Sequence, residues 1–147
     1  MQATAERRRV RVLIADDHSV IRRMVRSTLE SHPHFEVCGE AEDGVQAIKA
    51  AEELKPDVVV LNITMPVMDG FQAARQIKAR IPESAIVILS THADQGFIEE
   101  AKKIGVQGYV TKTQVGGTLL QAVDAVLRKE TFFPDRRQTA EAMLRPA

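Results

Sequence analysis

Short apolar runs recur along the chain, and each is followed by a turn and by a segment whose apolar residues have helical spacing. Residues 10–15, 58–61 and 85–89 consist almost entirely of Val, Ile, Leu and Ala, which is typical of parallel strands covered on both faces. Residues 35–39 alternate and predict a strand nearer an edge of the sheet, and residues 107–111 predict a fifth strand. The pattern therefore predicts a sheet of five strands.

Amphipathic segments separate and follow these strands. Ser19 is a candidate N-cap for the first helix, which should end before Pro33. Asp69 is expected to open the third helix, and Gly105 to end the fourth. The apolar positions at helical spacing are Ile21, Met24, Val25 and Leu29; Ala47, Ile48, Ala51 and Leu54; Phe71, Ala74, Ile77 and Ile81; Phe97, Ala101 and Ile104; and Leu119, Leu120, Val123, Val126 and Leu127. Because parallel strands need crossover connections, this alternation predicts a doubly wound α/β domain.

The composition fits one domain and excludes several classes of protein. A chain of 147 residues can bury one core of useful size. Its 20 Lys and Arg balance its 20 Asp and Glu, which argues against a basic nucleic-acid-binding field and against an acidic disordered chain. No apolar run approaches the roughly 18 residues of a membrane span. The single cysteine, Cys38, cannot form an internal disulfide and is expected to be a small core residue, so a cytoplasmic protein is predicted.

Polar side chains stand at the ends of four predicted strands. The first strand ends in Asp16 and Asp17, the third in Asn62, the fourth in Ser90, and the fifth in Lys112. Doubly wound folds bind ligands at this carboxyl edge of the sheet. Two adjacent carboxylates repel each other unless a cation lies between them, and oxygen ligands suit Mg²⁺. A lysine and a hydroxyl group add phosphate contacts, so the sequence predicts a magnesium and phosphate pocket.

Other chemistries have weaker support. No phosphate-binding glycine motif follows a strand, which disfavours nucleotide hydrolysis and dinucleotide redox chemistry. His18 and His92 should lie beside the predicted pocket, but neither has the partner spacing of a zinc site, and no catalytic role is assigned to them. His32 and His34 flank Pro33 in a loop and are expected to be solvated.

Four segments together resemble the receiver domain of bacterial two-component response regulators. They are VLIADDH at 12–18, VVVLNITMPVMDG at 58–70, VILSTH at 87–92 and GYVTK at 108–112. The resemblance covers residues 9–129. The segment ADDHSVIRRM also resembles the NarL/LuxR-type subgroup, whose members usually continue into a DNA-binding helix-turn-helix.

This resemblance implies a flavodoxin-like (CheY-like) fold with strand order 2-1-3-4-5 and helices on both faces. It also implies a phosphorelay in which a histidine kinase donates a phosphoryl group to an aspartate at the end of the third strand. By the same resemblance, Asp16 and Asp17 are the Mg²⁺ acids, and Thr64 offers its backbone carbonyl to the metal. Ser90 is then the switching hydroxyl and Lys112 the phosphate contact. Tyr109 falls at the position of the switch aromatic, whose orientation follows the hydroxyl.

The acceptor position, however, holds Asn62, which is also one of the implied metal ligands. A neutral amide is a poor nucleophile, and loss of one charge should weaken Mg²⁺ binding. Two explanations stay open: a deliberate Asp→Asn change in an ordinary receiver, or a natural pseudo-receiver that works as a dimerisation or docking module. An aspartate-based phosphohydrolase is disfavoured, because Asp16 is followed directly by Asp17 and His18 and no Asp-x-Asp motif is formed. A signalling switch is therefore expected, rather than an enzyme.

The chain is predicted to divide into a flexible lead-in at 1–8, the receiver at 9–129, and a tail or truncated linker at 130–147. The tail is too short for a helix-turn-helix, so direct DNA binding by this chain is not expected. Within it, residues 135–144 are a candidate short helix, and Phe132 and Phe133 should pack against the fifth helix or a partner.

The expected partners are a histidine kinase or phosphotransfer protein and, as a further possibility, a second copy of the chain. Three arginines, Arg22, Arg23 and Arg26, share the outer face of the first helix. They predict either a solvated face or a contact surface for the kinase.

Overall fold

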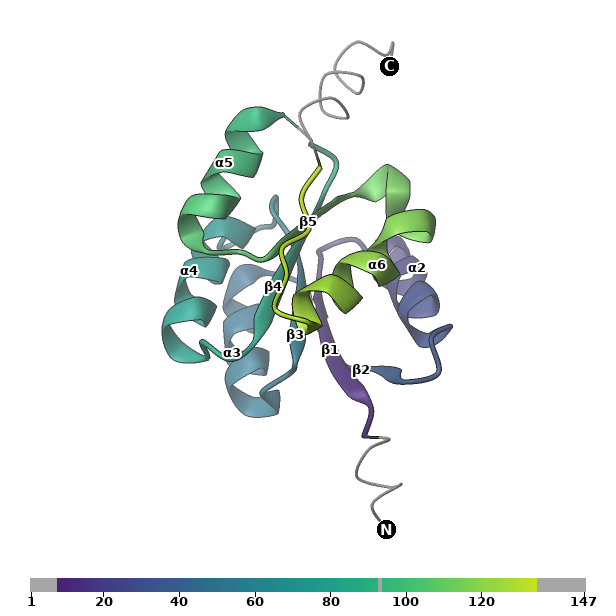
Figure 1. The fold of residues 1–147 in the computed structure, drawn as a ribbon. Coiled ribbons are helices and arrows are strands. Elements are labelled where there is room, and N and C mark those ends of the chain that lie inside the picture. The colour runs from purple at the N-terminus through teal and green to yellow at the C-terminus, as the bar shows by residue number, and fades with distance from the viewer. Residues whose placement is uncertain (1–7, 93, 135–147) are drawn as a thin grey trace.

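A computed structural model describes residues 8–92 and 94–134, and its five parallel strands form one sheet in the order β2-β1-β3-β4-β5 (Figure 1). The strands are β1 (Val10–Ala15), β2 (Phe35–Ala41), β3 (Val58–Asn62), β4 (Ala85–Ser90) and β5 (Gly108–Thr111). The predicted fold, strand order and parallel direction are confirmed. The alternating strand is at the edge, as predicted, but it extends to Ala41 because Ala15 still pairs with that residue.

Five α-helices cover both faces of the sheet. They are α2 (Ser19–Glu30), α3 (Gly44–Leu54), α4 (Gly70–Arg80), α5 (Gln95–Ile104) and α6 (Val115–Leu127), with a short 3₁₀ turn η1 (Lys112–Gln114) before the last. One core cluster joins the sheet to α3, α4 and α5, and the other joins it to α2 and α6. In β1, Leu13 faces the first cluster and Val12 the second, because successive strand residues point to opposite faces. Of these described helices, none has the length and apolar character needed to cross a membrane.

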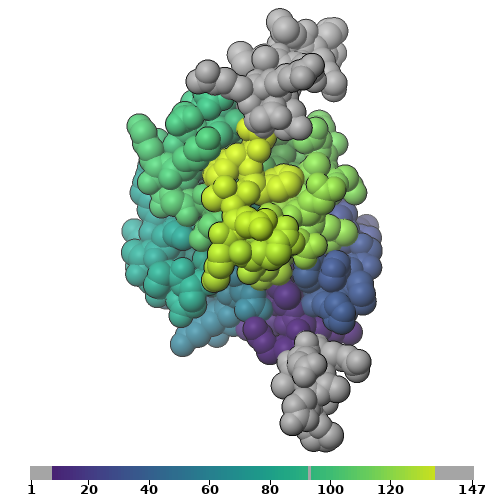
Figure 2. Space-filling model, viewed as in Figure 1, coloured from purple at the N-terminus to yellow at the C-terminus, as the bar shows by residue number. Residues whose placement is uncertain are grey.

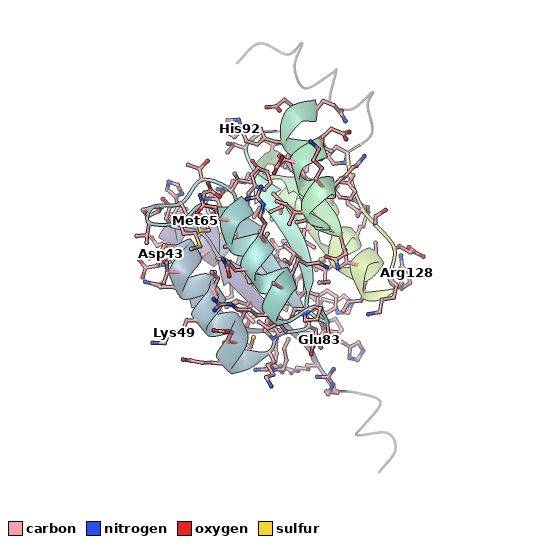
Figure 3. The ribbon with its side chains drawn as sticks, turned by 90° about the vertical axis from the view of Figure 1, so that its left-hand side faces the viewer. Asp43, Lys49, Met65, Glu83, His92 and Arg128 are labelled. Atoms are coloured by element: carbon pink, nitrogen blue, oxygen red, sulfur yellow. The ribbon has the colours of Figure 1, made fainter. Side chains whose placement is uncertain are left out.

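Helix starts bring polar groups to the carboxyl edge of the sheet. Asp69 caps α4 as predicted, and its side chain accepts a hydrogen bond from Gln72 N at 2.9 Å. The assignment of Ser19 as N-cap is wrong: Ser19 is the first helical residue, and His18 is the cap without a side-chain cap bond. In Figure 3, Asp43 and His92 lie toward the N-terminal ends of α3 and α5, whereas Glu83 lies at the opposite end of the domain.

Cys38 lies in an irregular part of the β1–β2 ladder. Val12 pairs with Val37 and Leu13 with Gly39, so the residue between them is left out of the register. Cys38 is half-buried and packs against the edge of the first core cluster, rather than fully inside it as predicted. Burial raises the pKa of its thiol above the ordinary value, which is the environment of an unreactive cysteine.

Residues 131–134, which we call the strap, lie against β5 after the end of α6. Phe132 packs with the cluster that contains α6, as predicted, whereas Phe133 packs with the cluster on the other face. Figure 2 shows the yellow C-terminal segment on the surface between α5 and α6. The candidate helix at 135–144 and the lead-in at 1–7 lie outside the described residues.

Gly116 and Gly117 weaken the first turn of α6 and provide a test of this helix. Both are exposed, and a Cβ added at either would meet no atom within 4 Å. Gly116→Ala and Gly117→Ala should each raise the free energy of unfolding by about 0.5–1 kcal/mol, because alanine loses less backbone entropy in a helix. Urea denaturation followed by circular dichroism measures the change.

Gly70→Ala is the matched control for these two substitutions. A Cβ at Gly70 would collide with the backbone of Asn62 and Ile63, so this variant should lose stability. A loss of stability in Gly116→Ala would show that the first turn of α6 is not helical in solution.

Candidate functional site

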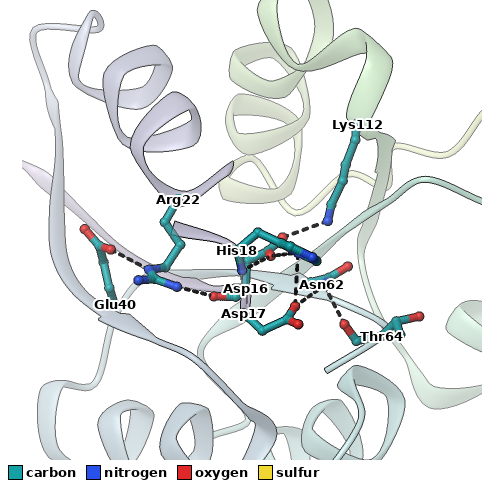
Figure 4. Close-up of polar contacts among 8 residues, drawn as sticks. All are labelled: Asp16, Asp17, His18, Arg22, Glu40, Asn62, Thr64 and Lys112. Atoms are coloured by element: carbon teal, nitrogen blue, oxygen red, sulfur yellow. Dashed lines mark hydrogen bonds and ion pairs between the residues drawn. The ribbon is translucent and has the colours of Figure 1, made fainter. Parts of the chain in front are cut away.

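Four of the polar residues predicted at the strand ends meet at the carboxyl edge of the sheet, namely Asp16, Asp17, Asn62 and Lys112 (Figure 4). Lys112, directly after β5, places its Nζ 2.8 Å from Asp16 Oδ2. Asn62, the last residue of β3, places its Nδ2 3.3 Å from Asp17 Oδ1 and 2.7 Å from the carbonyl oxygen of Thr64. Ser90 at the end of β4 is buried, but its Oγ contacts the backbone N of His92 at 3.0 Å. Asp16, Asp17, Asn62, Thr64 and Lys112 thus form one cluster.

Asp16 is the most enclosed charge of the site. It is 1% exposed, and Lys112 pairs with its Oδ2 while His18 N donates to its Oδ1 at 2.9 Å. Lys112 is itself only 11% exposed at its side chain. A buried carboxylate is costly unless a cation compensates it, so Lys112 stabilises the folded domain as well as forming part of the site.

His18 belongs to the site, although no role beyond proximity to the pocket was predicted for it. Its Nδ1 lies 3.1 Å from Asp16 Oδ1 and 3.2 Å from Asp17 Oδ1. The three side chains bring their ligand atoms within 4.8 Å of one another, close enough to hold a metal ion. The signal in the sequence was its position next to two aspartates, where a histidine side chain can fold back onto both carboxylates.

The Asn62 amide has a defined orientation because both of its nearby partners are acceptors. Its N–H₂ group donates to Asp17 Oδ1 and to Thr64 O, whereas the reverse orientation would place two oxygens against its Oδ1. Asp17 and the Thr64 carbonyl are two of the four metal ligands that the family resemblance implies, beside Asp16 and Asn62. The oxygen ligands fit a hard divalent cation in type, but a cation would have to displace the amide hydrogens from two of them.

The loop after β3 aims the Thr64 carbonyl at the site. Gly70 N donates to Ile63 O at 2.6 Å, which pulls the start of α4 onto the end of β3. Only glycine fits at position 70, because a Cβ would collide with the Asn62 backbone. Val67 at the tip of this loop is 81% exposed and has a φ of 69°, a conformation that a β-branched residue rarely adopts.

Arg22 supports the site from α2, and this was missed in the sequence. Its Nη1 donates to Asp16 O at 2.7 Å and its Nε to Glu40 Oε1 at 2.8 Å. Arg26 pairs with the other Glu40 oxygen at 2.7 Å, and Arg23 alone of the three is exposed. The arginines therefore do not form one solvated face, because two of them tie α2 to β2.

Tyr109 is fully buried in β5, and its OH donates to the carbonyl oxygen of His92 at 2.6 Å. Burial raises the pKa of its phenol to about 12, although the Ser90 hydroxyl acts in the opposite direction. The His92 backbone thus contacts both residues that were expected to move together, because its N–H contacts Ser90 and its C=O accepts from Tyr109.

This fold, with two acids, a hydroxyl and a lysine at the carboxyl edge, defines a receiver-type signalling domain rather than a nucleotide-binding one. The model of the family described as the response regulator receiver domain matches residues 12–124. The chain therefore belongs to the response regulator receiver family.

Several known proteins are similar to this chain. It is 32% identical over 90% of its length to the transcriptional regulatory protein DegU of Brevibacillus brevis, of which it spans 56%. It is 36% identical over 78% of its length to the chemotaxis protein CheY of Listeria monocytogenes, of which it spans 96%. A crystal structure of a two-component response regulator of the LuxR family from Aurantimonas sp. SI85-9A1 has a TM-score of 0.84 at 32% identity, and the match covers 93% of this chain and 99% of that one. The chain thus spans a little over half of the DegU protein.

Glu40 gives the site a pH dependence with a defined sign. Burial would raise the pKa of this carboxyl, but hydrogen bonds from Arg26 and Arg22 hold the pKa below its ordinary value. A depressed pKa contributes stability that is complete above the unfolded value and is lost as the pH falls through the folded one. Glu40→Gln should therefore lower the free energy of unfolding at pH 7, and its difference from the parent should shrink below about pH 4.5.

Chemical denaturation at a series of pH values measures this difference. Glu83→Gln is the control, because exposed Glu83 forms no ion pair with residues in 8–92 or 94–134. A Glu40→Gln deficit that stays constant down to pH 3 would contradict the role of the arginines.

Lys112→Met should destabilise the domain strongly, because it leaves Asp16 buried without its cation. Loss of one partner of a buried ion pair costs about 3–5 kcal/mol. The cost of Lys112→Met should be smaller in an Asp16→Asn background, since a neutral amide does not require a cation. Urea denaturation of the two single variants and the double variant measures this coupling, and exposed Lys49→Met is the control. Equal costs in both backgrounds would contradict the pairing.

Proposed function

We propose that this chain is the receiver of a two-component phosphorelay in a form that cannot be phosphorylated at position 62. The observation that carries the proposal is the retained cluster of Asp16, Asp17 and Lys112 around an amide. Every predicted component of the phosphoryl site is present except the carboxylate that would attack phosphorus.

The chemistry of Asn62 supports this proposal. A carboxylate oxygen carries a negative charge and attacks phosphorus to form an acyl phosphate, whereas the amide oxygen is neutral and its nitrogen lone pair is delocalised. In this chain the amide hydrogens are also engaged by Asp17 and Thr64 O. The group at the acceptor position is therefore a hydrogen-bond donor where the reaction requires a nucleophile.

Mg²⁺ is the proposed cofactor, with reduced affinity. Asp16, Asp17, Thr64 O and Asn62 Oδ1 would provide its protein ligands. When bound, the ion neutralises charge on a phosphoryl group. The site contributes one negative charge fewer than a receiver with aspartate at position 62, and the Asn62 amide must first release its two acceptors.

In this proposal, Ser90 is the switching hydroxyl, Lys112 the phosphate contact and Tyr109 the switch aromatic. Moving a two-state equilibrium from 1:99 to 99:1 takes about 5.5 kcal/mol, which phosphoryl contacts to Lys112, Ser90 and a metal can supply. Without a phosphoryl group at position 62, that source of energy is missing. The chain then remains in its unphosphorylated state.

The proposed partner is a histidine kinase or phosphotransfer protein, and the proposed readout surface consists of α5, β5 and α6. DegU is named a transcriptional regulatory protein, and the matched part is only 56% of it. A transcriptional output for this chain would therefore depend on a partner or on sequence outside the receiver.

A second candidate is a natural pseudo-receiver that acts as a dimerisation or docking module without phosphorylation. The observation in its favour is that both hydrogens of the Asn62 amide are already paired within the site. The amide N–H₂ group of Asn62 thus has its acceptors within the chain, as a module with one fixed conformation requires.

Incubation with Mg²⁺ and acetyl phosphate, followed by intact-mass measurement, distinguishes these candidates. An adduct on Asn62→Asp, and none on the parent chain, is expected for a disabled receiver. Asn62→Asp with Asp17→Asn is the control, because loss of the metal acid should suppress the adduct. No adduct on Asn62→Asp would overturn the phosphorelay proposal and favour the pseudo-receiver, whereas an adduct on the parent chain would show that the acceptor is not residue 62.

A further inference from the structure

The strap extends the sheet beyond β5. Phe132 N donates to Gln107 O at 2.9 Å, and Tyr109 N donates to Phe132 O at 2.8 Å, so Phe132 forms a parallel bridge with Gly108. β5 is the last strand in the sheet order, and the strap therefore occupies an edge that would otherwise present unpaired backbone groups.

Two phenylalanines hold the strap from opposite faces of the sheet. Phe132 packs with the cluster of α2 and α6, and Phe133 packs with the cluster of α3, α4 and α5. The Lys102 Nζ of α5 lies 5.2 Å from the centre of the Phe133 ring. An open surface pocket of about 630 Å³ lies beside the strap, and its lining includes Lys102, Gln107 and Phe133.

A continuous path of hydrogen bonds joins the site to this strap. Ser90 Oγ accepts from His92 N at 3.0 Å, and His92 O accepts from the Tyr109 hydroxyl at 2.6 Å. The backbone N–H of the same tyrosine then donates to Phe132 O. Tyr109 is thus bonded through its side chain to the loop at the site and through its main chain to the strap.

We propose that the strap is a readout element coupled to Tyr109: it pairs with β5 while the Tyr109 side chain is buried and detaches when that side chain leaves the core. The position of Tyr109 is thereby transmitted to the chain that follows residue 134. The coupling is an equilibrium property, so detaching the strap must also loosen Tyr109. The proposed coupling between the strap and Tyr109 rests on contacts of this conformation alone, and neither Asn62 nor a phosphoryl group takes part in it.

Tyr109 supplies its own spectroscopic signal, because the sequence has one tyrosine and no tryptophan. Phe132→Ala should make the fluorescence of Tyr109 more accessible to quenching by acrylamide. The two rings belong to clusters on opposite faces of the sheet, so an effect of Phe132 on Tyr109 has to pass through the strap, either by its backbone pairing with β5 or by Phe133, which packs in the cluster of Tyr109. Leu54→Ala, which removes a half-buried side chain beside Gly39 in β2, the edge strand opposite β5, is the matched control.

The reverse direction is tested by hydrogen exchange. Tyr109→Phe keeps the ring but removes the bond to His92 O, and we expect exchange at the Phe132 amide to accelerate about fivefold, the ratio for one typical hydrogen bond. Exchange at the Ala51 amide in α3 should not change. Unchanged exchange at Phe132, or a quenching response of Phe132→Ala no larger than that of Leu54→Ala, overturns the proposal and leaves the strap as a static cover of the edge. Neither measurement uses a phosphodonor or Mg²⁺, so their outcome is independent of the phosphorelay proposal.

Discussion

The ion pair between Lys112 and Asp16 is the interaction on which the site depends. It joins the turn after β5 to the end of β1, across the carboxyl ends of the two strands between them. Taking both charges out of water is costly, so the pair persists only where geometry and further hydrogen bonds compensate. Here His18 and Arg22 supply these hydrogen bonds. The backbone N–H of His18 donates to the Asp16 side chain, and Arg22 donates to the Asp16 backbone carbonyl. The same contacts that make the buried pair tolerable therefore also fix the positions of the acids.

The Asn62 amide gives the site a different charge balance from the one that an aspartate at the same position would give. An aspartate at the same position would be a third carboxylate beside Asp16 and Asp17, and repulsion among the three would make the site depend on Lys112 and a cation. The amide removes that repulsion and adds two donated hydrogen bonds, to Asp17 and to Thr64 O. Compared with an aspartate at this position, the amide makes the site less dependent on a cation and offers no carboxylate nucleophile.

The sequence predicted the strands and the site because both depend on local patterns. The runs at 58–61 and 85–89 are apolar on both faces, which only a central parallel strand requires, and the polar residues that follow them must lie at the carboxyl edge. The roles of Thr64 and Tyr109 came from family resemblance alone. Contacts between distant segments could not be predicted from the sequence pattern, because they depend on how the sheet and helices pack. Examples are the hydrogen bonds of Arg22 to Asp16 and Glu40 and the pairing of Phe132 with β5. Ser19 was misassigned because a serine before a helix looks like a cap, whereas the Asp16 carboxylate already fixes the turn at His18.

The two edges of the sheet are protected in different ways, and the difference explains why the strap can carry information. At the β2 edge, the irregular register at Cys38 and the half-exposed Glu36 discourage pairing with another chain without any additional segment. At the β5 edge, protection comes from the strap, whose removal exposes the backbone beside Tyr109. The irregular register of β2 is a permanent part of the fold, whereas a strap held by two backbone hydrogen bonds and two rings can detach. The strap covers the β5 edge and can leave it, so it is coupled to the contacts that hold β5 in place. In this domain those contacts include Tyr109, the single tyrosine, which is buried and bonded to the loop at the site.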